Sequence, residues 1–128
     1  MSRPVRETVT VLAVDDSEPY RVIAAEVVNA TQGFELIGEA ASGQDAVDAA
    51  SRLRPDLVLL DVHMPGADGL QTSCHLAGAS HPTVVVLISA DDTAVSDEDL
   101  SGCGAAAFVP KHRLSPRTLR AVWARHGT

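Results

Sequence analysis

Short apolar runs alternate with segments of helical periodicity along most of this chain, and this alternation constrains the fold more than any other feature. The apolar runs are Val9–Val14, Phe34–Ala40, Leu57–Leu60, Val84–Ile88 and Ala105–Val109. They are nearly continuous, which is typical of strands covered on both faces, as in a parallel sheet. Phe34–Ala40 is the most polar of them and is expected to form an edge strand.

The segments between these runs carry apolar residues at helical spacing. One stripe consists of Tyr20, Ile23, Ala24 and Val27, and a second of Ala46, Ala49, Ala50 and Leu53. Shorter helices are expected over Gly69–Ala77 and Ser96–Gly102, and a last helix from Pro116 after a cap at Ser115. Right-handed crossovers place such helices on both sides of one parallel sheet, which is an α/β doubly wound architecture.

The composition fits one domain and excludes several classes of function. We place the domain at residues 8–128 of the 128, after a short N-terminal segment, 1–7. The 17 acidic and 10 basic residues give a net charge of −7, which argues against binding nucleic acid or an anionic membrane. No apolar run approaches the roughly 20 residues of a membrane helix, and we find no signal peptide, so a cytoplasmic location is expected. Cys74 and Cys103 lack metal-site spacing and are expected to be free thiols.

Polar side chains follow four of the five apolar runs. Asp15 and Asp16 come after the first run, Asp61 after the third, Ser89 after the fourth, and Lys111 shortly after the fifth. In a doubly wound sheet, ligands bind outside the carboxyl ends of the strands, so these groups are expected at one rim. Three crowded carboxylates repel one another unless a hard divalent cation and an ammonium group compensate their charge. The sequence therefore predicts a Mg²⁺ (or Mn²⁺) site beside a lysine.

This arrangement suits phosphoryl transfer to a carboxylate, because that reaction depends mainly on positioning and charge neutralisation. Asp61, at the end of the central strand, is the best-placed nucleophile and would form an acyl phosphate. Asp15 and Asp16 would hold the metal ion, while Lys111 and the Ser89 hydroxyl would contact phosphoryl oxygens. The small side chain of Ala90 would leave room for the phosphoryl group.

The same residues carry a resemblance to a known family. The segments are VLAVDDS (Val11–Ser17), LVLLDVHMPGADG (Leu57–Gly69), VVVLISA (Val84–Ala90) and AAAFVPK (Ala105–Lys111). With them the chain resembles the receiver domain of two-component response regulators, most closely receivers that precede helix-turn-helix output domains. The resemblance implies a stand-alone receiver with a flavodoxin-like five-stranded parallel sheet of strand order 2-1-3-4-5.

The resemblance also implies partners and further residue roles. The phosphoryl donor would be a phosphohistidine on a sensor histidine kinase or histidine phosphotransfer protein, or a small acyl phosphate. The backbone carbonyl of His63 would complete the metal ligands, and Ser89 and Phe108 would act as a switch. They would reshape the surface of the fourth helix, fifth strand and fifth helix, which would bind a downstream protein. His63 and Asp91 would tune the lifetime of the acyl phosphate, alongside Ala90 in the same pocket.

Such a receiver catalyses its own phosphorylation and dephosphorylation without turning over a metabolite. We expect a monomer or a phosphorylation-dependent dimer. A basic last helix, which includes Arg117 and Arg120, could also receive an acidic partner, although a solvated helix face explains the same charges.

Three features depart from the family pattern. His112 follows Lys111 where proline is usual, and Pro110 precedes the lysine instead, so a different loop geometry is expected. Phe108 replaces the commoner tyrosine and offers no hydroxyl. The fourth helix is short and flanked by acidic residues, so a poorly formed helix is expected.

Three other functions fit these residues less well, and the unusual loop Pro110–His112 keeps only the first of them open. A degenerate receiver would act as a phosphorylation-independent interaction module, which the complete set of acids, hydroxyl and lysine argues against. An aspartyl phosphatase of the haloacid-dehalogenase kind would carry Asp-x-Asp after its first strand, whereas Asp61-x-His63 lies mid-chain here. A flavin-binding protein would need a phosphate-cradling loop or flanking aromatic residues, and neither is found.

Overall fold

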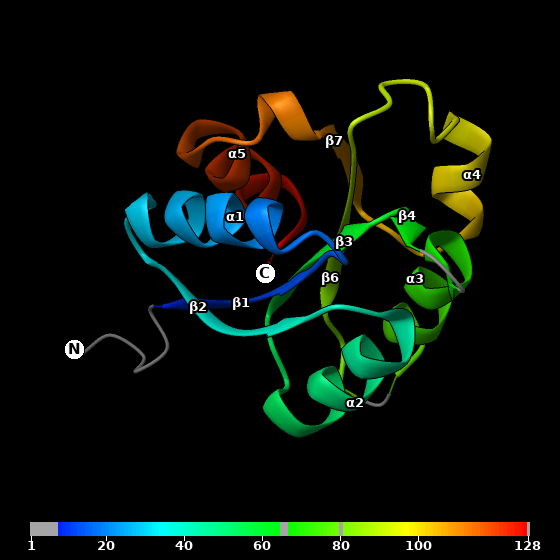
Figure 1. Cartoon of the computed structure of the whole chain (residues 1–128), viewed down its shortest axis with the longest axis horizontal. Helices are drawn as coiled ribbons and strands as arrows, with labels where there is room; N and C mark the ends of the chain where they lie inside the picture. Colours follow the sequence, from blue (N-terminus) through cyan, green and yellow to red (C-terminus); the bar gives the residue numbers. More distant parts are fainter. Residues whose placement is uncertain (1–7, 65–66, 80, 128) are drawn as a thin grey trace.

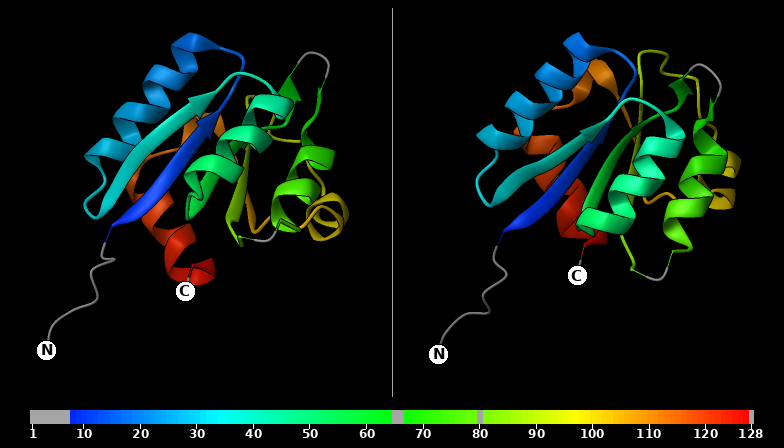
Figure 2. Two further views of the ribbon diagram at one scale, coloured as in Figure 1. Left: turned by 90° about the horizontal axis from the view of Figure 1, so that it is seen from below. Right: turned by 60° about the horizontal axis from the view of Figure 1, so that its bottom comes forward.

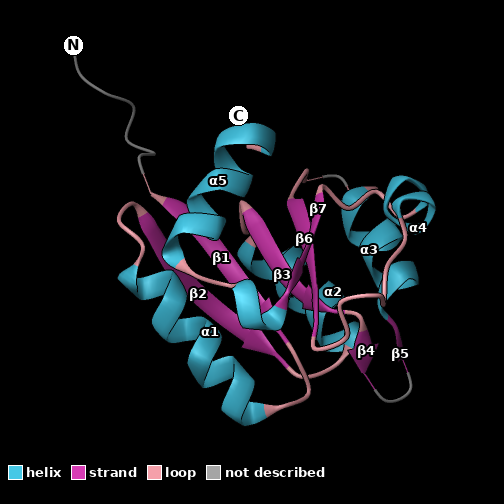
Figure 3. Cartoon of the chain, turned by 90° about the horizontal axis from the view of Figure 1, so that it is seen from above, coloured by secondary structure: helices cyan, strands magenta, loops and turns pink. Residues whose placement is uncertain are grey.

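Five parallel strands form the central sheet of the protein. The structure is a computed structural model that describes residues 8–64, 67–79 and 81–127, so the predicted N-terminal segment and the Pro65–Gly66 part of the motif lie outside the described residues. The strands are β1 (Val9–Val14), β2 (Phe34–Ala40), β3 (Leu57–Asp61), β6 (Val84–Ser89) and β7 (Ala107–Pro110). They lie side by side in the order β2-β1-β3-β6-β7, and all neighbours are parallel (Figure 3).

The predicted doubly wound parallel sheet is confirmed, and its strand labels differ from 2-1-3-4-5 for one reason. A two-stranded antiparallel hairpin, β4 (His63–Met64) and β5 (Ala67–Asp68), comes between β3 and β6 in the chain. Strands of two residues carry no periodic pattern, so the sequence did not indicate this hairpin. The fifth sheet strand begins at Ala107 rather than at the predicted Ala105, because a turn with Gly104 at a φ of 75° precedes it.

Helices cover both faces of the sheet, as Figures 1 and 2 show. Helices α1 (Glu18–Ala30) and α5 (Pro116–His126) lie on one side; α2 (Gly43–Leu53), α3 (Gly69–Ala77) and α4 (Asp97–Gly102) lie on the other. Serine side chains cap several of them, because a hydroxyl oxygen accepts hydrogen bonds from otherwise unpaired backbone N–H groups. Ser115 and Thr118 form a reciprocal capping box ahead of Pro116, so α5 begins where the sequence predicts.

Alternate residues of β3 enter two separate hydrophobic cores. Leu57 and Leu59 pack with Ala24 and other residues on the α1–α5 side, whereas Leu60 packs on the α2–α3 side. All three leucines are fully buried, and burial of one such side chain contributes about 1.5–3 kcal/mol. The sheet is thus held from both faces, and its carboxyl edge is left for polar groups.

The inward face of α1 differs from the predicted stripe. Ala24 and Val28 are its buried residues, whereas Ile23, predicted to be buried, is 50% exposed. The helix packs along positions 20, 24 and 28, spaced four residues apart, and this places Ile23 on the outer flank. Leu53 at the end of α2, also predicted to face the core, is 37% exposed.

Edge strand β2 is irregular. Its register with β1 shifts between Val11, which pairs with Leu36, and Leu12, which pairs with Gly38. Ile37 is therefore an extra residue, which makes the shift a β-bulge. Within the part of the chain that the structure describes, no helix has the length and apolar character needed to cross a membrane.

Candidate functional site

The carboxylates of the site come from the ends of two neighbouring strands. Asp15 directly follows β1 and Asp61 is the last residue of β3, whose preceding residues Val14 and Leu60 are paired in the ladder. Asp16 follows Asp15 at the start of the loop to α1. The carboxylate oxygens of Asp15, Asp16 and Asp61 all lie within 4.8 Å of one another. The structure thus brings together the three acids that the sequence singled out.

Backbone hydrogen bonds hold the two buried acids in place. The Ser17 amide donates to Oδ1 of Asp15 at 2.9 Å, and the His63 amide donates to Oδ1 of Asp61 at 3.2 Å. Arg21 donates from Nη1 to the backbone carbonyl of Asp15 at 2.6 Å. Each buried carboxylate therefore keeps its second oxygen, Oδ2, directed to other partners.

Lys111 lies against both buried carboxylates. Its Nζ is 2.7 Å from Oδ2 of Asp15 and 3.7 Å from Oδ2 of Asp61. The Tyr20 ring covers the ammonium, with its centroid 4.4 Å from Nζ, and the Tyr20 hydroxyl donates to the Lys111 carbonyl at 3.5 Å. A cation above an aromatic face is electrostatically stabilised. Tyr20 and Arg21 were not predicted as site residues, although their positions in the first turn of the helix after the acid pair could have suggested it.

The crowding of acids is visible in two pKa values. Burial, and then the carboxylate of Asp15, raises the pKa of Asp61 from 3.8 to about 6, although the Lys111 ammonium and the His63 amide act in the opposite direction. Burial, followed by the charges of Asp15 and Asp61, raises the pKa of Tyr20 from 10.0 to about 12. Burial is thus the main cause of both shifts, and the charge of neighbouring carboxylates adds to it.

This donor set fits a hard divalent cation. Three carboxylates present oxygen ligands, which Mg²⁺ and Mn²⁺ prefer, and a cation would offset the carboxylate charge that adds to burial in raising the pKa of Asp61. The backbone carbonyl of His63, the fourth ligand implied by the resemblance, remains a prediction.

Ser89 and its neighbours lie on the next strand of the sheet. Ser89 ends β6, one residue beyond the pair that Ile88 forms with Asp61. Its side chain is buried, and its Oγ accepts a hydrogen bond from the Asp91 amide at 3.0 Å, which leaves the hydroxyl proton for another acceptor. Ala90 is exposed beside it.

The Asp91 side chain forms hydrogen bonds within its own loop. Its Oδ1 accepts hydrogen bonds from the amide (2.9 Å) and hydroxyl (2.8 Å) of Thr93, and these bonds lower the pKa of Asp91. His63 is exposed and lies close enough to Asp91 to contribute to that lowering. These two residues therefore lie near each other at the outer rim of the site.

The structure describes all three features that depart from the family pattern. Lys111–Arg113 form a short 3-10 helix, and the peptide bonds of the described residues are all trans, so Lys111 reaches Asp15 from a loop with histidine in the usual proline position. Helix α4 is short but formed, with a capping box between Ser96 and Asp99, which differs from the poorly formed helix expected. Phe108 is partly buried against the core on the α2–α3 side.

Comparisons with known proteins agree with this geometry. The model of the response regulator receiver domain family matches residues 11–123. A protein-glutamate methylesterase/protein-glutamine glutaminase from Anaeromyxobacter dehalogenans is 41% identical over 118 residues, which is 91% of this chain and 31% of the relative. A second such protein from Vibrio vulnificus is 37% identical over 80% of this chain and 28% of the relative. The chain thus spans less than a third of the length of these relatives.

Solved structures show the same fold. The receiver domain of the NarL response regulator from Mycobacterium tuberculosis superposes with a TM-score of 0.79 at 30% identity, covering 91% of this chain and 97% of that one. The chemotaxis protein CheY4 of Vibrio cholerae superposes with a TM-score of 0.79 at 26% identity, covering 92% and 98%.

Proposed function

Because the chain belongs to the response regulator receiver domain family, we propose that it accepts a phosphoryl group on Asp61 in a Mg²⁺-dependent reaction. The observation that carries this proposal is the gathering of Asp15, Asp16 and Asp61 within 4.8 Å, with the Lys111 ammonium against two of them. A group arriving with its own negative charge needs both the Lys111 ammonium and a bound cation in a pocket that holds three carboxylates. The proposal treats residues 8–128 as one receiver domain.

In the proposed reaction, a carboxylate oxygen of Asp61 attacks the phosphorus atom of a phosphohistidine. The new P–O bond forms as the P–N bond breaks, and the donor imidazole leaves with the electron pair. A bound Mg²⁺ would supply charge neutralisation on the phosphoryl oxygens. Lys111 pairs with one phosphoryl oxygen of the product, and the Ser89 hydroxyl donates a hydrogen bond to another.

The proposed partners follow from that chemistry. A sensor histidine kinase or histidine phosphotransfer protein donates the phosphoryl group in the cytoplasm, and a downstream protein binds the surface of α4, β7 and α5. Ser89 and Phe108 would transmit the change between the two, because one lies at the acceptor and the other on β7. The protein acts as a monomer or as a dimer formed on phosphorylation.

Intact-mass spectrometry with acetyl phosphate tests the proposal. The parent protein should gain one phosphoryl group with Mg²⁺ and none with a chelator, and Asp61→Asn should gain none under either condition. Asp97→Asn, which removes an exposed carboxylate on α4, should react like the parent. Beryllofluoride binding, followed by ¹⁹F NMR, should depend on Asp61 in the same way. A parent protein that takes up neither probe would support the phosphorylation-independent interaction module instead.

A further inference from the structure

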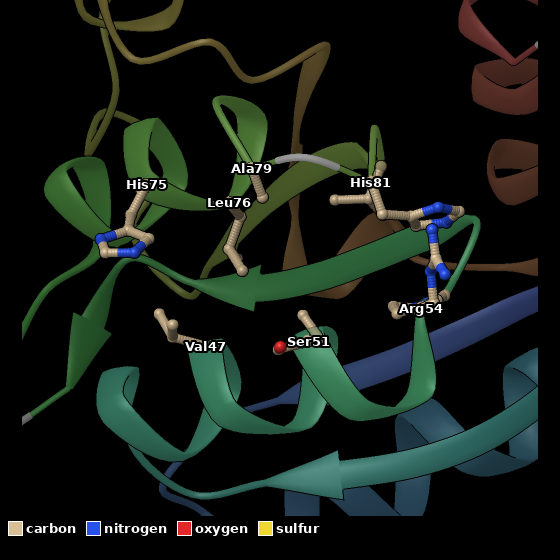
Figure 4. Close-up of a pocket in the computed structure, with 10 residues that line it drawn as sticks. Val47, Ser51, Arg54, His75, Leu76, Ala79 and His81 are labelled. Atoms are coloured by element: carbon tan, nitrogen blue, oxygen red, sulfur yellow. The ribbon is translucent and has the colours of Figure 1, made fainter.

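A cavity of about 340 Å³ lies between α2 and α3, at the end of the sheet opposite the acidic site (Figure 4). Two of its lining residues, Pro55 and Thr83, precede strands β3 and β6. The acids of the proposed phosphorylation site instead follow the carboxyl ends of β1 and β3. The cavity is therefore separate from that site, and no role of the receiver chemistry uses it.

The lining of this cavity combines an apolar wall with basic and hydroxyl side chains. Val47, Ala50 and Leu76 are among the apolar residues, while Arg54 and His81 supply nitrogen donors. None of the described residues that line the cavity is acidic, although the chain has 17 acidic residues against 10 basic ones. In an acidic protein, a cavity with only basic charge favours an anion.

Two of the residues that line this cavity each carry a buried side-chain atom with no hydrogen-bond partner among the described residues. They are Nε2 of His81 and Oγ1 of Thr83. Polar atoms removed from water are nearly always paired in folded proteins, because leaving them unpaired costs free energy. A ligand with oxygen acceptors, placed in the cavity, would give such atoms their partners.

Arg54, one of the residues that line the cavity, has an unusual backbone conformation. With a φ of 52°, it is the single non-glycine residue of the described chain in the left-handed region. Glycine avoids the steric cost of that conformation, so an arginine at this position calls for a reason. In Figure 4, Arg54 and His81 lie toward one end of the cavity and His75 toward the other.

A simpler role accounts for part of this charge. Arg54 caps the C-terminus of α2 and His75 lies in the last turn of α3, where basic groups offset the negative end of the helix dipole. That role explains neither the cavity nor the unpaired atoms of His81 and Thr83, which are not helix-end residues. A helix-end role alone predicts no ligand in the cavity, whereas a binding site predicts one.

We propose that the cavity between α2 and α3 binds a small organic carboxylate whose apolar body is about the size of one aromatic ring. Arg54 and the His81 imidazole hold the carboxylate, since a guanidinium and an imidazole N–H both donate to carboxylate oxygens. Leu76 and Val47 contact the apolar body. The volume is within the lower range of small-molecule sites, which begins at roughly 300 Å³.

Titration of the ¹⁵N-labelled full chain with phenylacetate, followed by NMR, tests the proposal. Amide shifts should change for residues 47–55 and 75–83 and saturate with phenylacetate. Phenylacetamide, which has the same ring without the charge, and inorganic phosphate, which has charge without the ring, should each bind at least about tenfold more weakly. Equal binding of phenylacetamide, equal binding of phosphate, or no saturable shift with phenylacetate would each overturn the proposal.

Variants separate loss of binding from loss of fold. Arg54→Gly relieves the left-handed strain while it removes the guanidinium, so the variant should fold at least as stably and bind phenylacetate about tenfold more weakly. Ala79→Phe should fill the cavity from an exposed position and abolish binding. The matched control, Arg52→Gln, removes a charge that faces a different surface pocket and should leave the affinity unchanged. An Arg54→Gly variant with parental affinity would assign Arg54 to the helix end alone.

Discussion

The Lys111 ammonium lies 2.7 Å from the Asp15 carboxylate. This contact links the end of β7, which precedes Lys111, to the end of β1, across the strands β3 and β6 that lie between them. Only 2% of the Asp15 side chain and 18% of the Lys111 side chain are exposed, which limits screening of the pair by water and salt. Asp61 is 3.7 Å from the same ammonium, so its attraction to Lys111 is weaker than that of Asp15. Lys111 therefore has a structural role as well as its proposed role toward the phosphoryl group.

Replacing Lys111 with glutamine should lower the free energy of unfolding by about 2 kcal/mol, because two buried carboxylates lose their counter-charge. Urea denaturation at pH 7 in a chelating buffer measures the change. Adding Mg²⁺ should restore part of it, since a ligand that binds only the native state stabilises that state. Arg120→Gln, an exposed control on α5, should stay within about 0.5 kcal/mol of the parent. Equal losses in both variants would contradict the structural role.

Asp61→Asn should stabilise the metal-free protein at pH 7 but not at acidic pH. The pKa of Asp61 is about 6 in the native state against 3.8 for a free side chain, so the native state binds the proton more tightly. The resulting stability is fully present below pH 3.8 and is lost as the pH rises through about 6. The asparagine variant does not suffer this loss and should exceed the parent by roughly 1–2 kcal/mol at pH 7.

Denaturation curves at pH 4 and pH 7, with and without Mg²⁺, test this prediction. With Mg²⁺ at pH 7 the parent should gain stability relative to Asp61→Asn, because the metal ion needs the ionised Asp61. A difference between parent and variant that is the same at both pH values without metal would contradict the assigned cause.

Tyr20 is the only tyrosine of the chain, so its ionisation can be followed directly by near-ultraviolet absorbance. The folded protein should titrate near pH 12, and the urea-unfolded chain near the ordinary value of 10.0. Because burial is the largest cause, Asp15→Asn should remove only the smaller part of the difference. A folded-state midpoint close to 10.0 would contradict the burial of the Tyr20 hydroxyl near the charges of Asp15 and Asp61.

Gly69→Ala should destabilise the protein by about 1–3 kcal/mol, because the added Cβ would lie 2.5 Å from backbone atoms of Val62. Val62 stands between the proposed acceptor Asp61 and His63, so phosphorylation should slow as well. Thermal unfolding and acetyl phosphate kinetics measure the two effects. The matched control is Gly102→Ala, where no atom lies within 4 Å of the added Cβ and stability should change by less than about 1 kcal/mol.

Substitutions of His63 and Asp91 should change the lifetime of the acyl phosphate more than the rate of its formation. Both residues are exposed near each other at the outer rim of the site, where we expect the attacking water to enter. We expect several-fold changes in dephosphorylation for His63→Ala and Asp91→Ala, measured by loss of the phosphoryl mass after rapid removal of the donor. Equal effects on gain and loss would assign these residues to the transfer step itself.

Much of the site could be predicted because polar residues follow four of the five apolar runs, directly or within two residues. The run Leu57–Leu60 leads directly to Asp61, and Val84–Ile88 leads directly to Ser89, so parallel pairing alone brings both side chains to one edge. The pairing also explains why Asp15 and Asp61 are neighbours despite their separation in the sequence. The apolar runs predict the strands, and the polar residues that follow them predict the site.

The parts that could not be predicted depend on side-chain packing between distant segments. The contact of Tyr20 with Lys111 requires the relative placement of α1 and the loop after β7, which no local pattern encodes. Ile23 has the spacing of a core residue, yet the helix rotates to bury Val28 instead. The cavity beside Arg54 and His81 is formed by two helices and contains no recognisable motif.

The bulge at Ile37 has a consequence for how copies of the chain meet. Strands β2 and β7 form the two borders of the sheet, where free backbone groups offer a template for strand addition. The bulge breaks the regular spacing of those groups on β2, and Pro110, which has no N–H, closes the four-residue β7. Both borders are thereby unsuited to growth of the sheet from molecule to molecule, which protects a chain with so apolar an interior from aggregating through its edges.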